Sequence, residues 1–316
     1  MKNILITGGA GFIGSHLCDY LLKDNNIICL DNLITGSFEN IRHISQHPHF
    51  QFIECDCTSA GKVLDALWDM QIDEIYHLAS IASPKFYVDY PLETIKVNTI
   101  GTEVLLEIAR KRNSKLLYTS TSEVYGDPLE HPQREEYTGN VNCIGQRAVY
   151  DESKRLGETL LSAYVRSFNV DAKIVRLFNT FGPRLAIGDG RIIPAFINQA
   201  LRNESITVFG SGTQTRSFCY VDDTVQALVK MMNSKHLGPI NIGNPYEYYS
   251  VQEVAEVIIE LMHTQSKIIY TDFLTADDPK VRQPDISKAK RLLQWQPIIA
   301  FDEGLLKTIE YFKSKI

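Results

Sequence analysis

The sequence has few residues of the kinds that build metal centres or disulfide frameworks. Its six cysteines include no C-x-x-C pair, and no Cys/His cluster has the spacing of a zinc site. Cys55 and Cys57 form the one close pair, but alternate residues of a strand point to opposite faces of a sheet. We therefore expect no bound metal, and free thiols in a reducing cytoplasm.

The sequence also lacks an excess of basic charge and any long apolar run. Its 32 Lys and Arg against 38 Asp and Glu give a formal charge of −6, the wrong sign for a general nucleic-acid binder. A strand pattern begins at Lys2, so we expect no signal peptide, and no apolar run approaches the ~20 residues that cross a bilayer. We expect a soluble cytoplasmic protein that binds neither nucleic acid nor membrane. An anionic ligand would have to be held by a few local arginines.

Short apolar, β-branched runs alternate with helical patterns in the first part of the sequence. The runs are 4–7, 27–31, 50–54, 74–79, 115–119 and 172–177, and the helical patterns lie near 12–23, 58–70, 92–112 and 148–168. Strands that alternate with helices are typical of βαβ units in a parallel sheet. The predicted fold class is therefore α/β, with a doubly wound parallel sheet of the Rossmann type.

After about residue 178 this alternation stops, and Pro and Gly interrupt 182–194 and 210–212. Helical patterns return near 192–202, 222–233, 250–262 and 302–313. We predict a nucleotide-binding domain from 1–178 with 217–243, and a smaller discontinuous substrate-binding lobe from 179–216 with 244–316. No repeat or low-complexity linker is visible between them, so the lobes should pack closely.

A glycine-rich turn joins the first predicted strand to the first predicted helix. Gly8, Gly11 and Gly14 have G-x-x-G-x-x-G spacing, which allows a tight turn, close approach of a pyrophosphate and helix N–H groups aimed at it. Asp31 ends the second strand, where a carboxylate accepts hydrogen bonds from a ribose and repels a 2′-phosphate. The pattern predicts bound NAD rather than NADP. Asp56, after the third strand, is a candidate contact for the adenine edge.

A tyrosine and a lysine one helical turn apart open the helical pattern at 148–168. Tyr150 and Lys154 share one face, and a neighbouring ammonium with a positive nicotinamide ring should lower the tyrosine pKa by roughly three units from its usual ~10. Tyr311 and Lys315 repeat this spacing on the last predicted helix. Only Tyr150 follows the fifth strand, near the carboxyl edge of the sheet where such folds bind ligands. Tyr150 is therefore the predicted base, and the second pair is predicted to be incidental.

Together these features resemble the extended short-chain dehydrogenase/reductases over essentially the whole chain and, within them, the UDP-glucuronate decarboxylases. The resemblance rests on the segments 8–17, 30–36, 77–80, 120–127, 150–155, 178–184, 210–216 and 277–285. Two departures lie near the expected sugar site. Ile81 stands where these decarboxylases usually have proline, and 142–149 lacks the prolines that they favour after Asn142 and Gly145.

The resemblance implies roles for particular residues. It places Thr121, Ser122, Glu123 and Arg282 in the catalytic group with Tyr150 and Lys154. For NAD it implies contacts from Gly8, Gly11, Phe12, Ile13, Gly14, Asp31, Asn32, Thr35, Gly36, Asp56, Cys57, Leu78, Ser80, Tyr150, Lys154, Thr180 and Arg191. For a UDP-sugar it implies contacts from Tyr87, Lys96, Asn179, Arg191, Arg216 and Arg282. It also implies a homodimer formed through the helices near 92–112 and 148–168.

The activity that the resemblance implies is decarboxylation of UDP-glucuronate to UDP-xylose. Tyr150 would take the proton of the C4 hydroxyl while hydride passes to NAD, and the resulting C4 ketone would let carbon dioxide leave. C5 would then be protonated and hydride would return to C4. Thr121 and Tyr150 would donate hydrogen bonds to the oxygen where charge develops. Glu123 and Arg282 would act at the C5/C6 end, with the proton donor open between them and water.

Other activities stay open at this point. A nucleotide-sugar 4,6-dehydratase or 4-epimerase has the same scaffold, another decarboxylase type releases a 4-keto-pentose with NADH, and a non-catalytic NAD sensor would keep only the fold. Dehydratases of dTDP-glucose usually carry an Asp–Glu pair where this sequence has Ser122 and Glu123, so the acid is missing. GDP-mannose dehydratases do carry Thr-Ser-Glu, and the triplet therefore does not settle the reaction. The intact pair of Tyr150 and Lys154 argues against the sensor.

Overall fold

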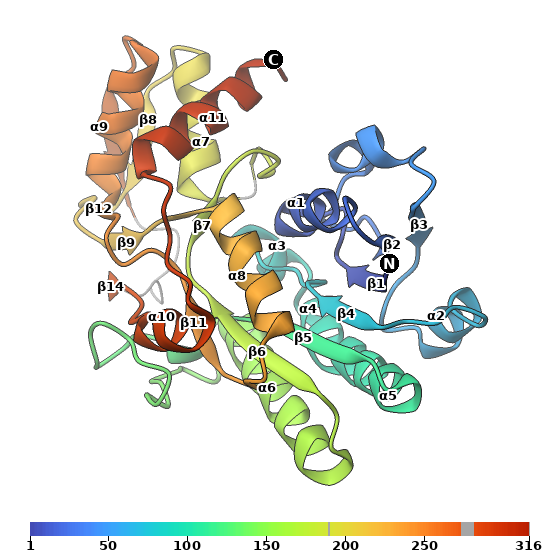
Figure 1. Ribbon diagram of the computed structural model, residues 1–316. Helices are drawn as coiled ribbons and strands as arrows, with labels where there is room; N and C mark the ends of the chain where they lie inside the picture. Colours follow the sequence, from blue (N-terminus) through green and yellow to red (C-terminus); the bar gives the residue numbers. More distant parts are fainter. Residues whose placement is uncertain (189, 273–280, 316) are drawn as a thin grey trace.

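The computed structural model describes residues 1–188, 190–272 and 281–315. Within them the central sheet has seven parallel strands in the order β11-β6-β5-β4-β1-β2-β3 (Figure 1). The strands are β1 (Asn3–Thr7), β2 (Asn26–Asp31), β3 (Phe50–Glu54), β4 (Glu74–His77), β5 (Lys115–Thr121), β6 (Ala172–Leu177) and β11 (Ile240–Ile242). The strand order reverses between β1 and β4, which is the doubly wound arrangement. The predicted fold class is confirmed.

Two strand ends differ from the sequence prediction because neighbouring strands set them. β4 ends at His77 rather than at residue 79, since β1 pairs with it only as far as Thr7. The chain then turns at Leu78 beside the glycine-rich turn. β5 continues to Thr121 rather than residue 119, because its register with β6 pairs Thr121 with Leu177. The extension brings Thr121 to the carboxyl edge of the sheet.

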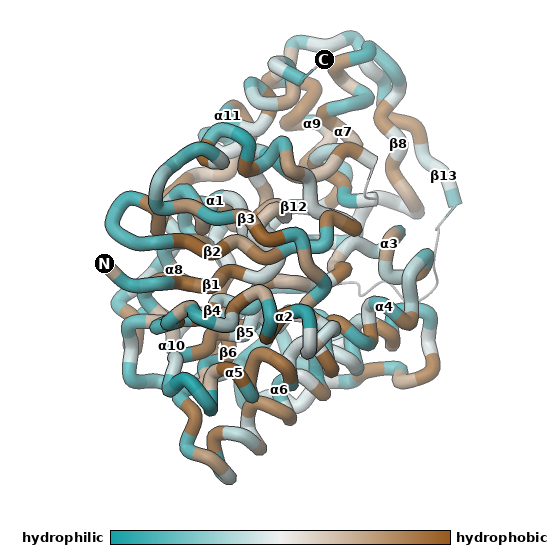
Figure 2. The backbone as a smooth tube through the Cα atoms, turned by 90° about the vertical axis from the view of Figure 1, so that its right-hand side faces the viewer, coloured by the Kyte–Doolittle hydropathy of each residue, from teal (hydrophilic) through white to brown (hydrophobic). Residues whose placement is uncertain are grey.

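Helices cover both faces of the sheet (Figures 1 and 2). The helices α5 and α6 contact β4, β5 and β6 on one face, while α1 and α8 contact each other and lie on the opposite face, against β1, β2, β5 and β6. Apolar brown segments run along β1 and β2 between these layers in Figure 2. The helices of this region are α1 (Phe12–Leu21), α2 (Ala60–Ala66), α3 (Pro84–Asp89), α4 (Pro91–Lys96), α5 (Thr102–Arg112), α6 (Ala148–Phe168) and α8 (Val221–Asn233), with short 3₁₀ turns at Phe38–Asn40, Arg42–Ile44 and Ser122–Tyr125.

The helix predicted near 92–112 is not a single regular α-helix. A π-helical turn, Val97–Gly101, separates α4 from α5. It contains Asn98, a fully buried residue whose amide Nδ2 donates to Ser153 Oγ of α6 at 2.9 Å. A π turn widens the helix by one residue, and such turns are frequent at functional sites. Tertiary bonding of one buried side chain therefore overrides a regular helical pattern.

Shorter sheets and helices follow the main sheet. β7 (Thr180–Phe181) pairs with β10 (Cys219–Tyr220), β9 (Thr215–Ser217) lies between β12 (Tyr248–Ser250) and β14 (Val281–Arg282), and β8 (Ile206–Phe209) pairs with β13 (Ile268–Thr271). The remaining helices are α7 (Ile192–Leu201), α9 (Val251–Met262), α10 (Ser287–Leu293) and α11 (Phe301–Lys313). The domain bounds given above stay a prediction, although β11 does return the chain from this part to the main sheet.

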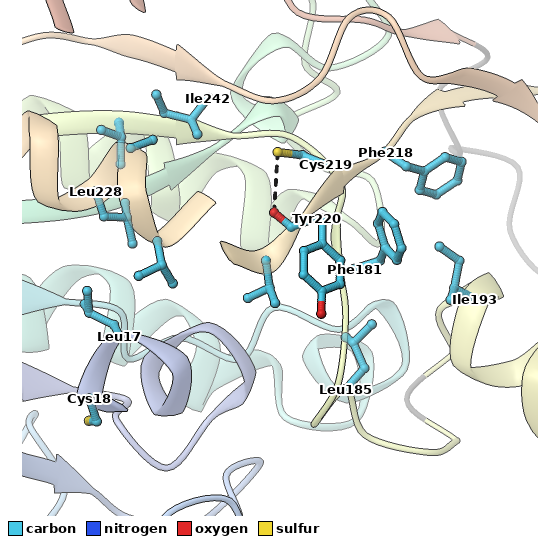
Figure 3. Close-up of a cluster of buried hydrophobic side chains, with 14 of the residues drawn as sticks. Leu17, Cys18, Phe181, Leu185, Ile193, Phe218, Cys219, Tyr220, Leu228 and Ile242 are labelled. Carbon is cyan, nitrogen blue, oxygen red and sulfur yellow. Dashed lines mark hydrogen bonds between the residues drawn. The ribbon is translucent and has the colours of Figure 1, made fainter. Parts of the chain in front are cut away.

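One continuous apolar core joins the main sheet to the smaller elements. Figure 3 shows Leu17 of α1 and Leu228 of α8 on one side of this cluster and Phe181, Phe218 and Tyr220 on the other. Phe301 of α11 completes it, since its ring lies 5.2 Å from that of Phe181 and 5.3 Å from that of Phe218. Burial of large aromatic rings is among the strongest contributions to a core. The cluster therefore fixes the smaller elements against the sheet.

The six cysteines are all free thiols, and only Cys143 is exposed. Over the described ranges, no helix has the length and apolar character needed to cross a membrane. The cytoplasmic location expected from the sequence stays a prediction.

Candidate active site

A cavity of about 1530 Å³ runs along the carboxyl edge of the main sheet. Its lining includes Gly8 after β1, Asp31 at the end of β2, Thr121 at the end of β5 and Leu177 at the end of β6. Every residue that the sequence predicted to contact NAD, substrate or the reacting atoms lies in this lining. The sequence predictions thus converge on one place, where open α/β sheets bind ligands.

The glycine-rich turn has no room for side chains. Gly8 has a φ of +72°, and a Cβ there would lie 2.6 Å from the backbone nitrogen of Ala79. A Cβ on Gly14 would lie 2.1 Å from the carbonyl oxygen of Gly8. Helix α1 begins at Phe12, and no side chain in the described ranges caps its first N–H groups. An uncapped helix end behind a tight turn fits the pyrophosphate of a dinucleotide.

Asp31 lies at the ribose side of this turn. Its carboxylate accepts hydrogen bonds from the backbone N–H groups of Ala10 at 3.0 Å and Leu33 at 2.8 Å. Burial raises the pKa of Asp31, and these bonds act against that rise. A Cβ on Gly36 would lie 2.9 Å from the carboxylate, so the absence of a side chain keeps this space open. The residues present fit an adenosine ribose, and their negative charge disfavours a 2′-phosphate.

Tyr150 and Lys154 lie on the first turns of α6, facing the cavity. The Tyr150 ring stacks on that of Tyr87 with 5.3 Å between centroids and 9° between planes. Lys154 Nζ donates to the carbonyl oxygen of Thr119 at 2.8 Å and lies 5.9 Å from the centre of the Tyr150 ring. Thr121 lies near enough to Tyr150 to act against the rise of the tyrosine pKa that burial causes. The predicted catalytic group is therefore assembled at one point.

The protein by itself does not lower the pKa of Tyr150, and the lowering expected beside a bound nicotinamide stays a prediction. Burial raises the pKa of Tyr150 and the negative charge of Glu123 adds to the rise, while the Thr121 hydrogen bond and Arg191 oppose it. Burial also lowers the pKa of Lys154, to about 7, so this lysine is a weaker counter-charge than the sequence suggested. A bound nicotinamide ring would supply the positive charge that favours the phenolate. The protein itself contributes to catalysis by holding the Tyr150 hydroxyl group in position.

Glu123 is a buried carboxylate held by two arginines. Arg282 approaches it with both terminal nitrogens, Nη2 lying 2.5 Å from Oε2 and Nη1 contacting Oε1. Arg147 Nη2 lies 2.5 Å from the same Oε2. Burial alone would raise the pKa of Glu123, but these two guanidinium groups outweigh it and the pKa lies below its ordinary value. Glu123 is therefore ionised at neutral pH.

Sequence reasoning missed three polar residues of this region. Arg147 and Asn98 are buried beside residues that it did find, and Asp151 follows Tyr150 directly. Burial and the charge of Glu123 raise the pKa of Asp151 to about 8. Only the position of Arg147, one helical turn before Tyr150, could have signalled its role. Nothing in the pattern near 92–112 separates Asn98 from an ordinary surface residue.

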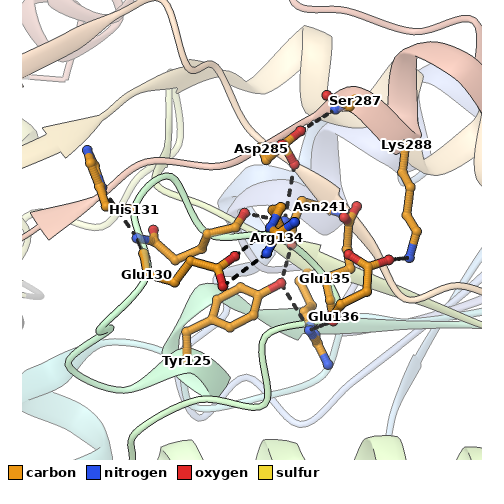
Figure 4. A network of polar contacts seen from close by, with 12 residues as sticks. Tyr125, Glu130, His131, Arg134, Glu135, Glu136, Asn241, Asp285, Ser287 and Lys288 are labelled. Carbon is orange, nitrogen blue, oxygen red and sulfur yellow. Dashed lines mark hydrogen bonds and ion pairs between the residues drawn. The ribbon is translucent and has the colours of Figure 1, made fainter.

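A hydrogen-bond network lies beside the segment that follows Arg282, and Figure 4 shows the part of it around Tyr125, Asn241 and Asp285. Tyr125 donates to Asn241 Oδ1 at 2.7 Å, and Asn241 Nδ2 donates to the carbonyl of Asp285 at 3.2 Å. Gln133 and Gln283 exchange bonds of 2.9 Å, from Gln133 N to the Gln283 carbonyl and from Gln283 N to Gln133 Oε1. The turn after β5 and the strand that carries Arg282 are thereby fixed to one another.

The predicted substrate contacts come from several elements around the cavity. Arg216 of β9 and Arg282 of β14 are paired residues of neighbouring strands. Asn179 precedes β7, Arg191 precedes α7, and Lys96 ends α4. Residues 277–280 of the predicted motif lie outside the described residues. Tyr311 and Lys315, predicted to be incidental, also line the cavity, although they come from the terminal helix.

Comparison with known proteins agrees with this geometry. Residues 4–243 match the model of the NAD dependent epimerase/dehydratase family. The chain is 48% identical over its whole length to UDP-glucuronic acid decarboxylase 1 of Xenopus tropicalis, covering 73% of that protein. It is 50% identical to UDP-glucuronic acid decarboxylase 6 of Arabidopsis thaliana, over 99% of this chain and 89% of the relative.

Solved structures show the same fold. UDP-glucose 4-epimerase of Thermotoga maritima, solved with UDP-glucose, has a TM-score of 0.92 and 29% identity, with 99% of each chain covered. UDP-glucuronic acid 4-epimerase of Bacillus cereus, solved with UDP-glucuronic acid and NAD, has a TM-score of 0.89 and 31% identity, with both chains fully covered.

Replacement of Gly14 by alanine should prevent dinucleotide binding, because the new Cβ would meet the Gly8 carbonyl. We expect NAD affinity to fall about tenfold or more, measured by titration calorimetry. Gly61→Ala in α2 is the matched control, since a Cβ there meets nothing within 4 Å. Its NAD affinity should stay as in the wild type. Unchanged affinity in Gly14→Ala would contradict this account of the turn.

Replacement of Asp151 by asparagine should change how stability depends on pH. A pKa of about 8, raised above the ordinary value, means that the folded chain binds this proton more tightly than the unfolded chain. The stabilisation is present below the ordinary pKa of aspartate and is lost as the pH rises through about 8. When the pH is raised from 5 to 9, the free energy of unfolding of the variant should increase relative to that of the wild type by more than about 1.4 kcal/mol.

Urea titrations of both proteins at several pH values measure this difference. Asp65→Asn, at an exposed position of α2, is the control and should run parallel to the wild type. Parallel curves for Asp151→Asn and the wild type would show that this carboxyl group does not hold a proton in the folded chain.

Proposed function

The chain belongs to the NAD-dependent epimerase/dehydratase family, and on that premise we propose that it is a UDP-glucuronic acid decarboxylase. It uses NAD to convert UDP-glucuronate to UDP-xylose. The proposal rests above all on identity near one half to such decarboxylases across the whole chain. It also rests on a site that joins Tyr150 and Lys154 to the ion pair of Glu123 and Arg282.

Tyr150 and Thr121 act at C4 of the sugar. Thr121 ends β5 and Tyr150 lies on the first turn of α6, and both line the cavity, so both can reach one hydroxyl group of the substrate. NAD, held by the glycine-rich turn and Asp31, would supply a hydride acceptor for C4 and return the hydride, so that no net oxidation would result. Tyr150 removes the hydroxyl proton, and then with Thr121 donates hydrogen bonds to the C4 oxygen while negative charge develops there. One such donor contributes roughly 10²–10³ in rate.

Glu123 and Arg282 act at the neighbouring end of the sugar. A C4 ketone lies β to the C6 carboxylate, so the electrons of the breaking C5–C6 bond pass into an enolate and carbon dioxide leaves. Glu123 is ionised between its two arginines and therefore carries no proton to give to C5 in this state. Arg282 holds the Glu123 carboxylate in place with both terminal nitrogens. The donor to C5 is then a water molecule or a group other than Glu123.

The 4-epimerases and 4,6-dehydratases remain the alternatives with the same scaffold, and the solved 4-epimerases show how alike these folds are. Ser122 occupies the position where dTDP-glucose dehydratases carry their acid, so this chain has no carboxyl group there. A dehydratase would need another proton donor for the departing hydroxyl. The sequence identity to decarboxylases favours loss of carbon dioxide.

Purified protein incubated with UDP-glucuronate and NAD should form a product lighter by one carbon dioxide, without accumulation of NADH. Mass spectrometry of the nucleotide sugar and absorbance of NADH measure both. Tyr150→Phe should lower the rate by about 10²–10⁴-fold, because the proton acceptor is lost. A product of unchanged mass would indicate a 4-epimerase, and loss of water from UDP-glucose would indicate a dehydratase. Native turnover by Tyr150→Phe would remove Tyr150 from the mechanism.

We further propose that the protein is a homodimer formed through the helical segments 92–112 and 148–168. The described residues of α4, the π turn and α6 expose large apolar side chains that a monomer would leave in water. Leu92 is 63% exposed, Ile100 is 44% exposed and Leu156 is 48% exposed. The helices α4 and α6 contact each other, so these side chains belong to adjoining surfaces. Apolar residues gathered on one surface are typical of subunit interfaces.

Leu156→Glu should convert a dimer to a monomer, since it places a charge in the apolar interface. Analytical ultracentrifugation measures the mass in solution. Leu306→Glu is the control, because Leu306 of α11 is 46% exposed but lies on another helix. A monomeric wild type would refute the dimer, and a dimeric Leu156→Glu protein would place the interface elsewhere.

A further inference from the structure

The lysine of the predicted catalytic pair lies over an aromatic ring of the main sheet. Lys154 Nζ is 4.7 Å from the centre of the Tyr118 ring, closer than the 5.9 Å that separates it from the centre of the Tyr150 ring. Tyr118 belongs to β5 and is fully buried. An ammonium group within about 6 Å of the centre of an aromatic ring is attracted by the electrons of that ring. Tyr118 is therefore placed to act on Lys154.

Lys154 is a buried cation that is not paired with a carboxylate. It is 2% exposed, and over the described residues no ion pair joins it to an acidic side chain. Glu158, one turn further along α6, pairs instead with Arg176 at 2.7 Å. Lys154 Nζ donates to the carbonyl oxygen of Thr119, the residue after Tyr118. A buried charge needs compensation, and here the end of β5 supplies both the carbonyl group and the ring.

Apart from Glu158, the titratable groups that face Lys154 are neutral near pH 7. Burial lowers the pKa of His77 of β4 to about 3, and the charge of Lys154 adds to this effect. Burial raises the pKa of the Cys57 thiol, after β3, to about 12, and it also raises the pKa of Tyr150. Burial lowers the pKa of Lys154 itself to about 7, while the charge of Glu158 opposes this change. Small changes around Lys154 therefore decide its charge at neutral pH.

The position of the Tyr118 ring depends on a glycine of α6. A Cβ on Gly157 would lie 2.2 Å from the hydroxyl oxygen of Tyr118 and 2.6 Å from its Cζ. Gly157 is three residues after Lys154, and residues three apart lie on the same side of a helix. The tyrosine therefore extends under the turn of α6 that carries Lys154, in space that a side chain at position 157 would fill. Burial raises the pKa of Tyr118, so the ring is an uncharged phenol.

We propose that Tyr118 is a positioning residue whose ring holds the ammonium group of Lys154 in place and stabilises its positive charge. Tyr118 does not line the cavity within the described part of the chain, so it acts through Lys154. A charged Lys154 in turn favours the phenolate of Tyr150. The inference rests on the proposed function only in that Lys154 assists Tyr150 during turnover.

The dependence of kcat/KM on pH tests this proposal. Tyr118→Met fills the space with a flexible apolar side chain but removes the ring. The alkaline limb of its profile should move to lower pH by about half a unit or more, because Lys154 loses its proton more readily. Tyr118→Phe keeps the ring and should keep the wild-type profile. The substrate is whichever nucleotide sugar the wild type converts, UDP-glucuronate or UDP-glucose.

Tyr76→Met is the matched control for the loss of a buried ring. Tyr76 lies on the neighbouring strand β4 and is as fully buried as Tyr118, but it belongs to the apolar cluster on the opposite face of the sheet. Its pH profile should stay as in the wild type. An unchanged profile in Tyr118→Met would overturn the proposal, and so would an equal shift in Tyr118→Phe or in Tyr76→Met.

Urea titrations follow the same charge without turnover. The pKa of Lys154 in the folded chain, about 7, lies below that of an unfolded lysine, so Lys154 is charged in the folded chain below about pH 7 and neutral above it. The ring stabilises the folded chain only while Lys154 is charged. Tyr118→Met should therefore lose more stability at pH 5 than at pH 9, by about 0.7 kcal/mol or more, which is half a pH unit converted to free energy.

A loss of stability that is equal at both pH values would show an ordinary packing role and overturn the proposal. Tyr118→Leu is a second replacement without a ring, and it should reproduce both effects if Tyr118→Met does not fold. If the wild type releases no carbon dioxide from UDP-glucuronate, the proposed function is wrong. The urea titrations then still decide whether Tyr118 stabilises the charge of Lys154.

Discussion

The buried carboxylate of Glu123 is the group on which the rest of the site depends. It follows β5 at the edge of the main sheet, and its partner Arg282 comes 159 residues later on a different sheet. A buried carboxylate loses its hydration, so it is stable only where cations replace that water. This requirement is met by Arg282, which joins β14 to the turn after β5 in the lining of the cavity.

The fold could be predicted because its signals are local. The bounds of β6 and α6 match the patterns at 172–177 and 148–168, since β-branched runs and helical spacing are decided within each segment. The errors lie where distant contacts decide. The register with β6 lengthens β5, and the buried amide of Asn98 accompanies a π turn in a helix that looked regular. Neither effect is visible in the segment itself.

The sequence predicts the site residues that belong to a motif of fixed spacing. It does not predict those whose role depends on charged groups from distant segments. The glycine turn and the pair of Tyr150 and Lys154 have fixed spacings, so the sequence alone identified them. Arg147 and Asp151 matter because the carboxylate of Glu123, from the turn after β5, lies beside them, and the sequence gives no distance between such groups. In the chain without a bound nicotinamide the pKa of Tyr150 is raised, because burial acts on it most strongly.

The pairing of Gln133 with Gln283 bears on the order in which the protein acquires its parts during synthesis. The glycine turn and Asp31 leave the ribosome early, whereas the strand that carries Arg282 emerges near the end and docks on a loop already made. The sugar end of the cavity is therefore complete only when two segments 150 residues apart, which carry Gln133 and Gln283, are joined.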